Sequence, residues 1–161
     1  MIDYTNIPST SAEPEASSMI ETFRAIGYSI ETAIADIIDN SITAEAKNIW
    51  IDYDWKGPKT TLSILDDGTG MNNEQLIQAM RPGSKNPLEE RNKDDLGRFG
   101  LGLKTASFSQ SRKFTVYSKA KDYKPIFWTW DLDYVNQEQA WKLIRYIPNE
   151  ENWSQKIETV E

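Results

Sequence analysis

Apolar residues recur at helical spacing in two segments near the start of the chain. The first stripe follows Pro14 in steps of three and four, and it consists of Ala16, Met19, Ile20, Phe23 and Ile26. The second follows Gly27 and Ser29, and it consists of Ile30, Ile34, Ile37, Ile38 and Ile42. Ser29 is a favourable N-cap residue, and Glu31 suits the positive end of a helix. These patterns predict two consecutive amphipathic helices.

Strand patterns follow these helices. Residues 48–55 are rich in aromatic and β-branched types, and a Gly-Pro turn at 56–59 leads to a second run at 60–65, which predicts a β-hairpin. Residues 112–119 and 125–131 predict another pair of strands. Shorter helical patterns lie at about 73–80, 101–109 and 138–143. We therefore expect an α/β sandwich, in which helices cover one face of a mixed, mostly antiparallel sheet of four or more strands.

The chain of 161 residues is the length of one domain. We expect a loose lead-in at residues 1–13 and the domain itself at 14–161. The sequence contains no cysteine and no histidine, which excludes disulfides, thiolate metal sites and Ser-His-Asp triads. It also has no apolar run near the ~20 residues of a membrane helix, and no N-terminal secretion signal. A cytoplasmic protein without a membrane partner fits these features.

Charge is distributed unevenly along the chain. The net charge of −7 does not favour direct binding of nucleic acid. Residues 81–124, however, contain eleven of the eighteen basic residues and only five acidic ones. A solvated charged face is the ordinary explanation of such a cluster, and a site for the phosphates of a nucleotide is the alternative.

Asp36 and Asn40 form the first candidate site. Their spacing of four places both side chains on one face of the second predicted helix, away from the isoleucines. A carboxylate can accept a proton from water, and an amide oxygen is a suitable ligand for Mg²⁺. The same pair also fits an ordinary solvated helix face.

The second candidate site follows the strand at 60–65, in the sequence Asp-Asp-Gly-Thr-Gly-Met at 66–71. Asp66 could accept a hydrogen bond from an exocyclic amine such as that of adenine. Gly68 and Gly70 would let the backbone approach a flat ring closely. A plain Asp-Gly turn is the alternative.

A glycine-rich bend at residues 97–102 provides the third candidate site. The N–H groups at the start of the following helix can bind an anion, and Lys104 adds a positive charge. The glycine order G-x-x-G-x-G matches neither the dinucleotide fingerprint nor the P-loop. Residues 81–96 form a long polar loop before this bend, which is typical of functional or mobile segments.

Taken in order, these segments resemble the sequence boxes of the GHKL superfamily of ATPases, which includes DNA gyrase B, the ninety-kilodalton heat-shock chaperone, MutL, MORC proteins and histidine kinases. Residues 35–41 match the N box, 66–71 the first glycine box, 81–96 the ATP lid and 97–104 the second glycine box. The resemblance extends over residues 15–135 and is MORC-like in character. It implies the Bergerat-type ATP-binding fold, ATP and Mg²⁺ as cofactors, and an ATP-dependent homodimer of the full-length protein.

The resemblance also implies roles for individual residues. Asp36 would be the catalytic base, and Asn40 would be the one protein ligand of Mg²⁺. Asp66 would accept from the adenine amine, in a base pocket completed by Gly68, Gly70 and Met71. The phosphates would be held by Ser84, Lys85, Gly97, Arg98, Phe99, Gly100, Leu101, Gly102, Leu103 and Lys104.

Two features depart from the family pattern. The N box usually begins with Glu, whereas position 36 is Asp, whose side chain is one methylene shorter. We expect a displaced water or slow hydrolysis, because a misplacement of ~1 Å can lower a rate ~100-fold. Family members also close the site with a later Gly-Thr strand, which this sequence lacks. We therefore expect an N-terminal piece without its last strand and without the transducer domain.

Four functional interpretations are compatible with the sequence. The first is an ATPase that drives a conformational or dimerisation switch in a larger protein. The second is an ATP-binding switch with little or no turnover. The third is the ATP-binding domain of a histidine kinase, although such kinases carry Asn at the position of Asp36 and this chain has no phosphoacceptor histidine. The simplest is an α/β domain that binds no nucleotide.

Overall fold

Two helices open the fold, as the apolar stripes predict. The computed structural model describes residues 5, 7–8, 10–25, 27–83 and 102–146. Helix α1 spans Ala16–Ala25 and helix α2 spans Ile30–Thr43. The Ser29 hydroxyl caps α2 by accepting the backbone N–H of Thr32 at 3.3 Å. The start of α2 therefore follows directly from its N-cap residue.

The described strands pair as two antiparallel hairpins. Strand β1 (Ile49–Asp54) pairs with β2 (Thr61–Asp66), and the short 3-10 helix η1 (Gly57–Lys59) connects them. Strand β3 (Lys113–Ser118) pairs with β4 (Ile126–Asp131). These antiparallel strands and the helices beside them confirm the expected α/β class.

The two hairpins form separate sheets in the part of the chain that the structure describes, rather than the single sheet of four or more strands expected from the sequence. After β2 the chain continues as a loop at residues 67–72 and not as a strand beside β3. There the backbone N–H of Met71 donates to Ser118 Oγ at 2.7 Å, so a loop and not a strand meets the end of β3.

Three further helices complete the described fold. Helix α3 spans Asn73–Met80, α4 spans Gly102–Gln110 and α5 spans Leu132–Glu138. The expected helix at 138–143 is wrong, because Asp131 caps a helix that begins earlier and Gln139 ends it in the left-handed conformation, with φ of 49°. The longest described helix, α2, has 14 residues, and none of the described helices could cross a membrane.

Helix α3 is held at both ends by tryptophans of β4. Trp128 Nε1 donates to Asn73 Oδ1 at 3.0 Å, at the first residue of the helix. Trp130 Nε1 donates to the backbone oxygen of Met80 at 3.1 Å, at the last residue. Because the two tryptophans are two residues apart, their side chains lie on the same face of β4, and that face supports α3.

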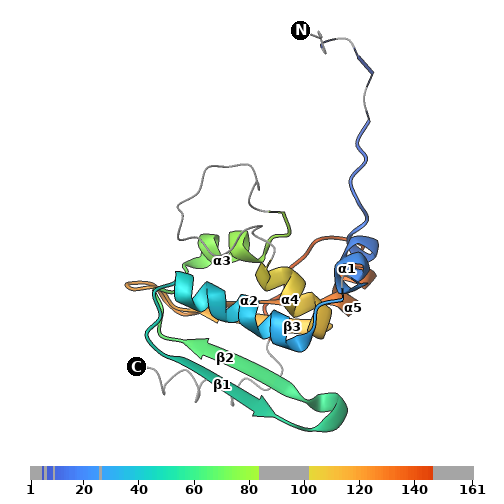
Figure 1. Cartoon of the computed structure of the whole chain (residues 1–161). Helices are drawn as coiled ribbons and strands as arrows, with labels where there is room; N and C mark the ends of the chain where they lie inside the picture. Colours follow the sequence, from blue (N-terminus) through green and yellow to red (C-terminus); the bar gives the residue numbers. More distant parts are fainter. Residues whose placement is uncertain (1–4, 6, 9, 26, 84–101, 147–161) are drawn as a thin grey trace.

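The core joins α1, α3, α4 and α5 to the second hairpin. The fully buried Phe108 of α4 contacts the rings of Phe114 and Trp130 edge-on, with centroids 5.2 and 5.8 Å away. The remaining buried members of this cluster are Ala16, Ile20, Leu76, Met80, Leu132 and Val135. Figure 1 shows the β1–β2 hairpin on the other side of α2 from α3. Five of the six residues of β1 are exposed, so this hairpin adds little to the core.

We expect Phe108→Ala to lower the free energy of unfolding by about 3–5 kcal/mol, because it empties the centre of an aromatic cluster. Urea denaturation followed by circular dichroism measures the change. The matched control is Tyr123→Ala, which removes a ring that is 57% exposed and should alter stability by less than about 0.5 kcal/mol. Equal effects of the two variants would contradict the central place of Phe108 in the core.

Candidate functional site

Helices α2 and α4 pack against each other and bring Asp36 of the first candidate segment to Gly102, the last residue of the glycine-rich bend. A Cβ built on Gly102, the first residue of α4, would lie 3.6 Å from Asp36 Oδ2. The half-buried Asp36 carboxylate thus flanks the N-terminus of α4, where backbone N–H groups can bind an anion. A water molecule between this carboxylate and such an anion would find its proton acceptor in place.

Asn40 lies one turn after Asp36 on the exposed side of α2. Its Nδ2 atom donates to the backbone oxygen of Asp36 at 2.7 Å. This bond fixes the amide so that its oxygen, a hard ligand of the kind Mg²⁺ prefers, is the atom offered to a cation. Among the described residues no three Asp or Glu side chains gather as a metal site, so a cation here would need most of its ligands from elsewhere.

Tyr28 belongs to this site, although the sequence analysis did not single it out. Its hydroxyl is hydrogen-bonded to the Asp36 carboxylate. Burial, then this hydrogen bond and the negative charge of Asp36, raise the pKa of Tyr28 above its usual value of 10.0. Gln110 Nε2 donates to the Tyr28 backbone oxygen at 2.9 Å, which ties this residue to the end of α4. Its only sequence signal is an aromatic side chain directly before the N-cap Ser29.

Asp66 ends β2 with a carboxylate that is oriented by two hydrogen bonds. Ser41 Oγ donates to Oδ2 at 3.0 Å, and the backbone N–H of Gly68 donates to Oδ1 at 2.9 Å. Ser41 is only 4% exposed and comes from α2, so one helix carries Asp36, Asn40 and the group that orients Asp66. Each carboxylate oxygen accepts more than one hydrogen bond, so Asp66 can still accept from a ligand. The sequence analysis missed Ser41, whose only signal is its place after Asn40.

The neighbouring Asp67 has a different environment. Its carboxylate accepts from the backbone N–H groups of Lys47 and Asn48, at 2.7 and 2.9 Å, and from Asn48 Nδ2 at 2.8 Å. These bonds, led by the backbone N–H of Asn48, lower the pKa of Asp67. Asp67 therefore anchors the start of β1, whereas the neighbouring Asp66 is oriented by Ser41 and Gly68 and can still accept a further hydrogen bond.

Gly68 and Gly70 stand where the backbone passes other segments closely. A Cβ on Gly68 would lie 2.7 Å from the backbone oxygen of Ala44, at the end of α2. Gly70 has φ of +66°, and a Cβ there would overlap the backbone oxygen of Lys119. The half-buried Met71 packs against the core. Packing within the protein therefore demands both glycines, while their contact with an adenine ring stays a prediction.

Lys104 has an arrangement that the sequence did not predict. Its side chain is buried, and its ammonium group donates to the backbone oxygens of Ala79 and Arg81 at the end of α3. The half-buried Leu103 and Gly102 precede it in α4. The other expected phosphate ligands lie outside the described residues, namely Ser84, Lys85, Gly97, Arg98, Phe99, Gly100 and Leu101. Most of the expected lid, residues 84–96, lies outside them too.

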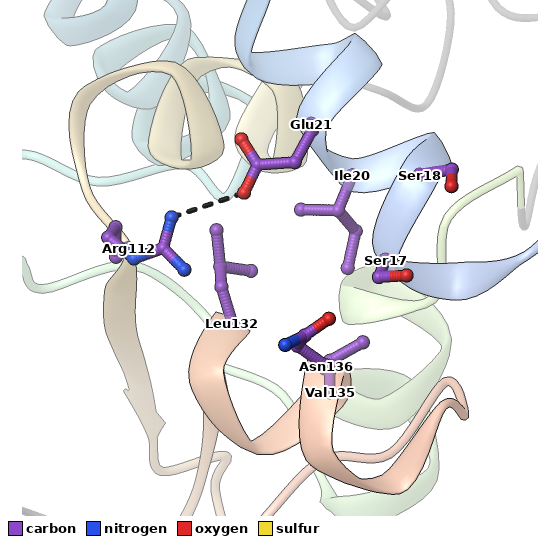
Figure 2. A pocket seen from close by; sticks show the side chains of 8 residues that line it. All are labelled: Ser17, Ser18, Ile20, Glu21, Arg112, Leu132, Val135 and Asn136. Atoms are coloured by element: carbon purple, nitrogen blue, oxygen red, sulfur yellow. Dashed lines mark hydrogen bonds and ion pairs between the residues drawn. The ribbon is translucent and has the colours of Figure 1, made fainter.

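A groove of about 400 Å³ lies between α1 and α5, and Figure 2 shows its lining. Arg112 pairs there with Glu21 at 3.1 Å and with Asp133 at 2.7 Å. Asp133 and then Glu21 raise the pKa of Arg112, since both stabilise its cation. None of the candidate residues that the structure describes lines this groove, and its charged groups connect α1, the start of β3 and α5.

Comparison with known proteins identifies the family. Residues 28–160 match the family model described as Histidine kinase-, DNA gyrase B-, and HSP90-like ATPase. ATPase morc-1 of Caenorhabditis elegans is 31% identical over 88 residues, which cover 55% of this chain and 10% of that protein. Chaperone protein HtpG of Campylobacter jejuni is 31% identical over 136 residues, which cover 74% of this chain and 22% of the chaperone.

DNA mismatch repair protein MutL of Dictyoglomus turgidum is 34% identical over 100 residues, which cover 60% of this chain and 17% of that protein. The chain thus spans only 10% to 22% of the length of these three relatives. The family model, by contrast, covers most of the chain, in the region that holds all three candidate segments. The resemblance stated from the sequence is confirmed, and the chain belongs to the family of histidine kinase-, DNA gyrase B- and HSP90-like ATPases.

Proposed function

We propose that this chain is the nucleotide-binding part of an ATPase, in which Mg²⁺-dependent hydrolysis of ATP drives a conformational or dimerisation switch of a longer protein. The observation that supports this proposal is that described residues from each of the three candidate segments meet at α2. Asp36 flanks Gly102 at the start of α4, Asn40 lies one turn away, and Ser41 orients Asp66.

The adenine base would bind beside the end of β2. Asp66 would accept a hydrogen bond from the exocyclic amine, because Ser41 and Gly68 already hold its carboxylate in one orientation. The backbone at Gly70 and the side chain of Met71 would line the same pocket. Selectivity for adenine over guanine follows from this arrangement, since guanine carries an oxygen at the corresponding ring position and would face a carboxylate.

Asn40 is the described residue that fits Mg²⁺ at this site. Asn40 would hold the ion through its amide oxygen, which the bond from Nδ2 to Asp36 leaves facing outward. The bound ion would neutralise phosphate charge. The absence of an acidic cluster in the described part of the chain agrees with a metal that binds together with the phosphates of the nucleotide.

Hydrolysis would depend on Asp36. Its carboxylate would accept a proton from the attacking water, at the point where α4 begins and its N–H groups face the phosphates. Tyr28 would hold the carboxylate while the proton moves, because its hydroxyl is bonded to the same group.

An ATP-binding switch with little turnover is the second candidate function. Two observations favour it, namely the shorter side chain of Asp36 and the hydrogen bond that Tyr28 makes to its carboxylate. The shorter side chain reduces the reach of the group that has to act on water, and the Tyr28 hydroxyl occupies a position on the carboxylate that water would otherwise take. The two functions share one binding site and differ only in turnover.

We expect Asp66→Asn to weaken ATP binding about 10- to 100-fold, because a charged acceptor of the adenine amine becomes a neutral amide. Isothermal titration calorimetry measures the affinity, and the thermal midpoint checks that the variant folds. Asp67→Asn is the matched control, since it changes the adjacent carboxylate, whose hydrogen bonds among the described residues go to the start of β1. Unchanged ATP affinity in Asp66→Asn would place the base pocket elsewhere.

We expect Asp36→Ala to lower kcat for phosphate release by about 100- to 10,000-fold and to leave ATP affinity almost unchanged, because a general base acts on water and not on the bound nucleotide. Asn40→Ala should instead weaken binding of ATP with Mg²⁺. Glu31→Ala is the control, since it removes an exposed carboxylate from the first turn of the same helix.

Asp36→Glu separates the two candidate functions, because it restores the side chain usual in the family. Its turnover should equal or exceed that of the wild type if Asp36 is a short but working base. Phosphate release that is undetectable in both proteins, measured in the full-length chain, would replace the ATPase with the binding switch.

A further inference from the structure

The ammonium group of Lys104 lies against the C-terminal end of α3. The side chain is 3% exposed, and Nζ donates to the backbone oxygens of Ala79 and Arg81 at 3.1 Å each. The backbone oxygen between them, that of Met80, accepts from Trp130 Nε1. Three successive carbonyls at this helix end therefore receive hydrogen bonds from side chains of other elements.

Each partner in this contact meets a need of the other. The last carbonyls of a helix have no partner within it and carry partial negative charge. A buried ammonium group is costly unless acceptors replace its water. Lys104 thus acts as a side-chain cap for α3, and it ties α3 to the beginning of α4.

The same lysine starts close to the proposed phosphate site. Lys104 is the third residue of α4, whose first residue, Gly102, flanks the Asp36 carboxylate. Its flexible four-carbon stem lets the ammonium reorient without movement of the helix. A phosphate oxygen also carries far more negative charge than a carbonyl, so its hydrogen bond to an ammonium is the stronger one.

We propose that Lys104 exchanges partners, so that it caps α3 in the nucleotide-free protein and leaves α3 for the phosphates when a triphosphate binds at the start of α4. This inference rests on the proposed function, because it requires phosphates at that helix end. The exchange leaves the carbonyls of Ala79 and Arg81 without their cation. Binding of the nucleotide therefore loosens the tie between α3 and α4.

The test measures both halves of the exchange in Lys104→Met, which keeps an apolar stem and removes the charge. The thermal midpoint of the nucleotide-free variant should fall by about 3–10 °C, because the cap of α3 is lost. Its affinity for ATP in calorimetry should fall about 10- to 100-fold, while its affinity for AMP should change less than ~3-fold. Lys59→Met, in the exposed helix η1, is the matched control and should change neither quantity.

Both changes together support the exchange, and either one alone overturns it. A lower midpoint with an unaltered preference for ATP over AMP means that Lys104 is a permanent cap. A loss of affinity for ATP but not for AMP, without a lower thermal midpoint, means that Lys104 is a phosphate ligand that does not stabilise α3. A wild type that binds neither ATP nor AMP removes the proposed function and with it the exchange.

Lys104→Gln covers the case in which Lys104→Met does not fold. The glutamine amide can still donate to one carbonyl of α3 but brings no charge to a phosphate. We expect this variant to fold and to lose affinity for ATP about 10-fold relative to AMP. An unchanged ratio of the two affinities overturns the exchange while leaving the proposed binding of ATP intact.

Discussion

The packing of α4 against α2 is the constraint on which the candidate site depends. At one end of α4, Phe108 is fixed in the core, and its backbone oxygen accepts from Arg24 Nη1 at 2.8 Å. At the other end, Gly102 flanks Asp36. A shift of α4 by one residue would move its start by about 1.5 Å along the axis. A displacement of that size is comparable with those that abolish efficient chemistry, so the aromatic core fixes the geometry of the site from a distance.

Helix α2 provides a common frame for groups with different tasks. Asp36, Asn40 and Ser41 lie within two turns of it, and its end at Ala44 contacts Gly68. The groups proposed for water and metal, and the hydroxyl that orients Asp66, thus share one rigid element, because a helix changes the spacing of its residues very little. A movement of α2 would alter all three at once, which favours cooperative loss of the site over independent adjustment of its parts.

The sequence predicted most of the local structure and less of the tertiary detail. The isoleucine stripe, the N-cap Ser29 and the two hairpins are local patterns, and the structure contains them. Helix α5 was not predicted with these bounds, because its C-cap residue Gln139 adopts the left-handed conformation. Glycine usually occupies such a position, and the sequence has no glycine there to mark the end of the helix. Ser41 and Tyr28 were missed because their partners, Asp66 and Asp36, are brought to them by packing.

Lys104 shows why side-chain roles are harder to predict than elements. A lysine after a glycine-rich bend is typical of an anion site. That local pattern gives no information about contacts with α3, which precedes Lys104 in the chain by more than twenty residues. Only the packing of α3 on α4 reveals a second set of acceptors. The roles inferred for the residues between Gly83 and Gly102 remain predictions from the family pattern.

The hydrogen bonds that the indole N–H groups of Trp128 and Trp130 donate to α3 limit how this helix can move. Trp128 holds its first residue and Trp130 its last, and both side chains belong to one short strand. A piston-like slide along the helix axis would break both indole bonds together. A pivot about the Trp128 end, or unravelling of the last turn, would keep the Trp128 bond and break those to the carbonyls of Met80, Ala79 and Arg81. A motion of α3 that keeps the Trp128 bond is therefore a swing or an unwinding of its C-terminal end.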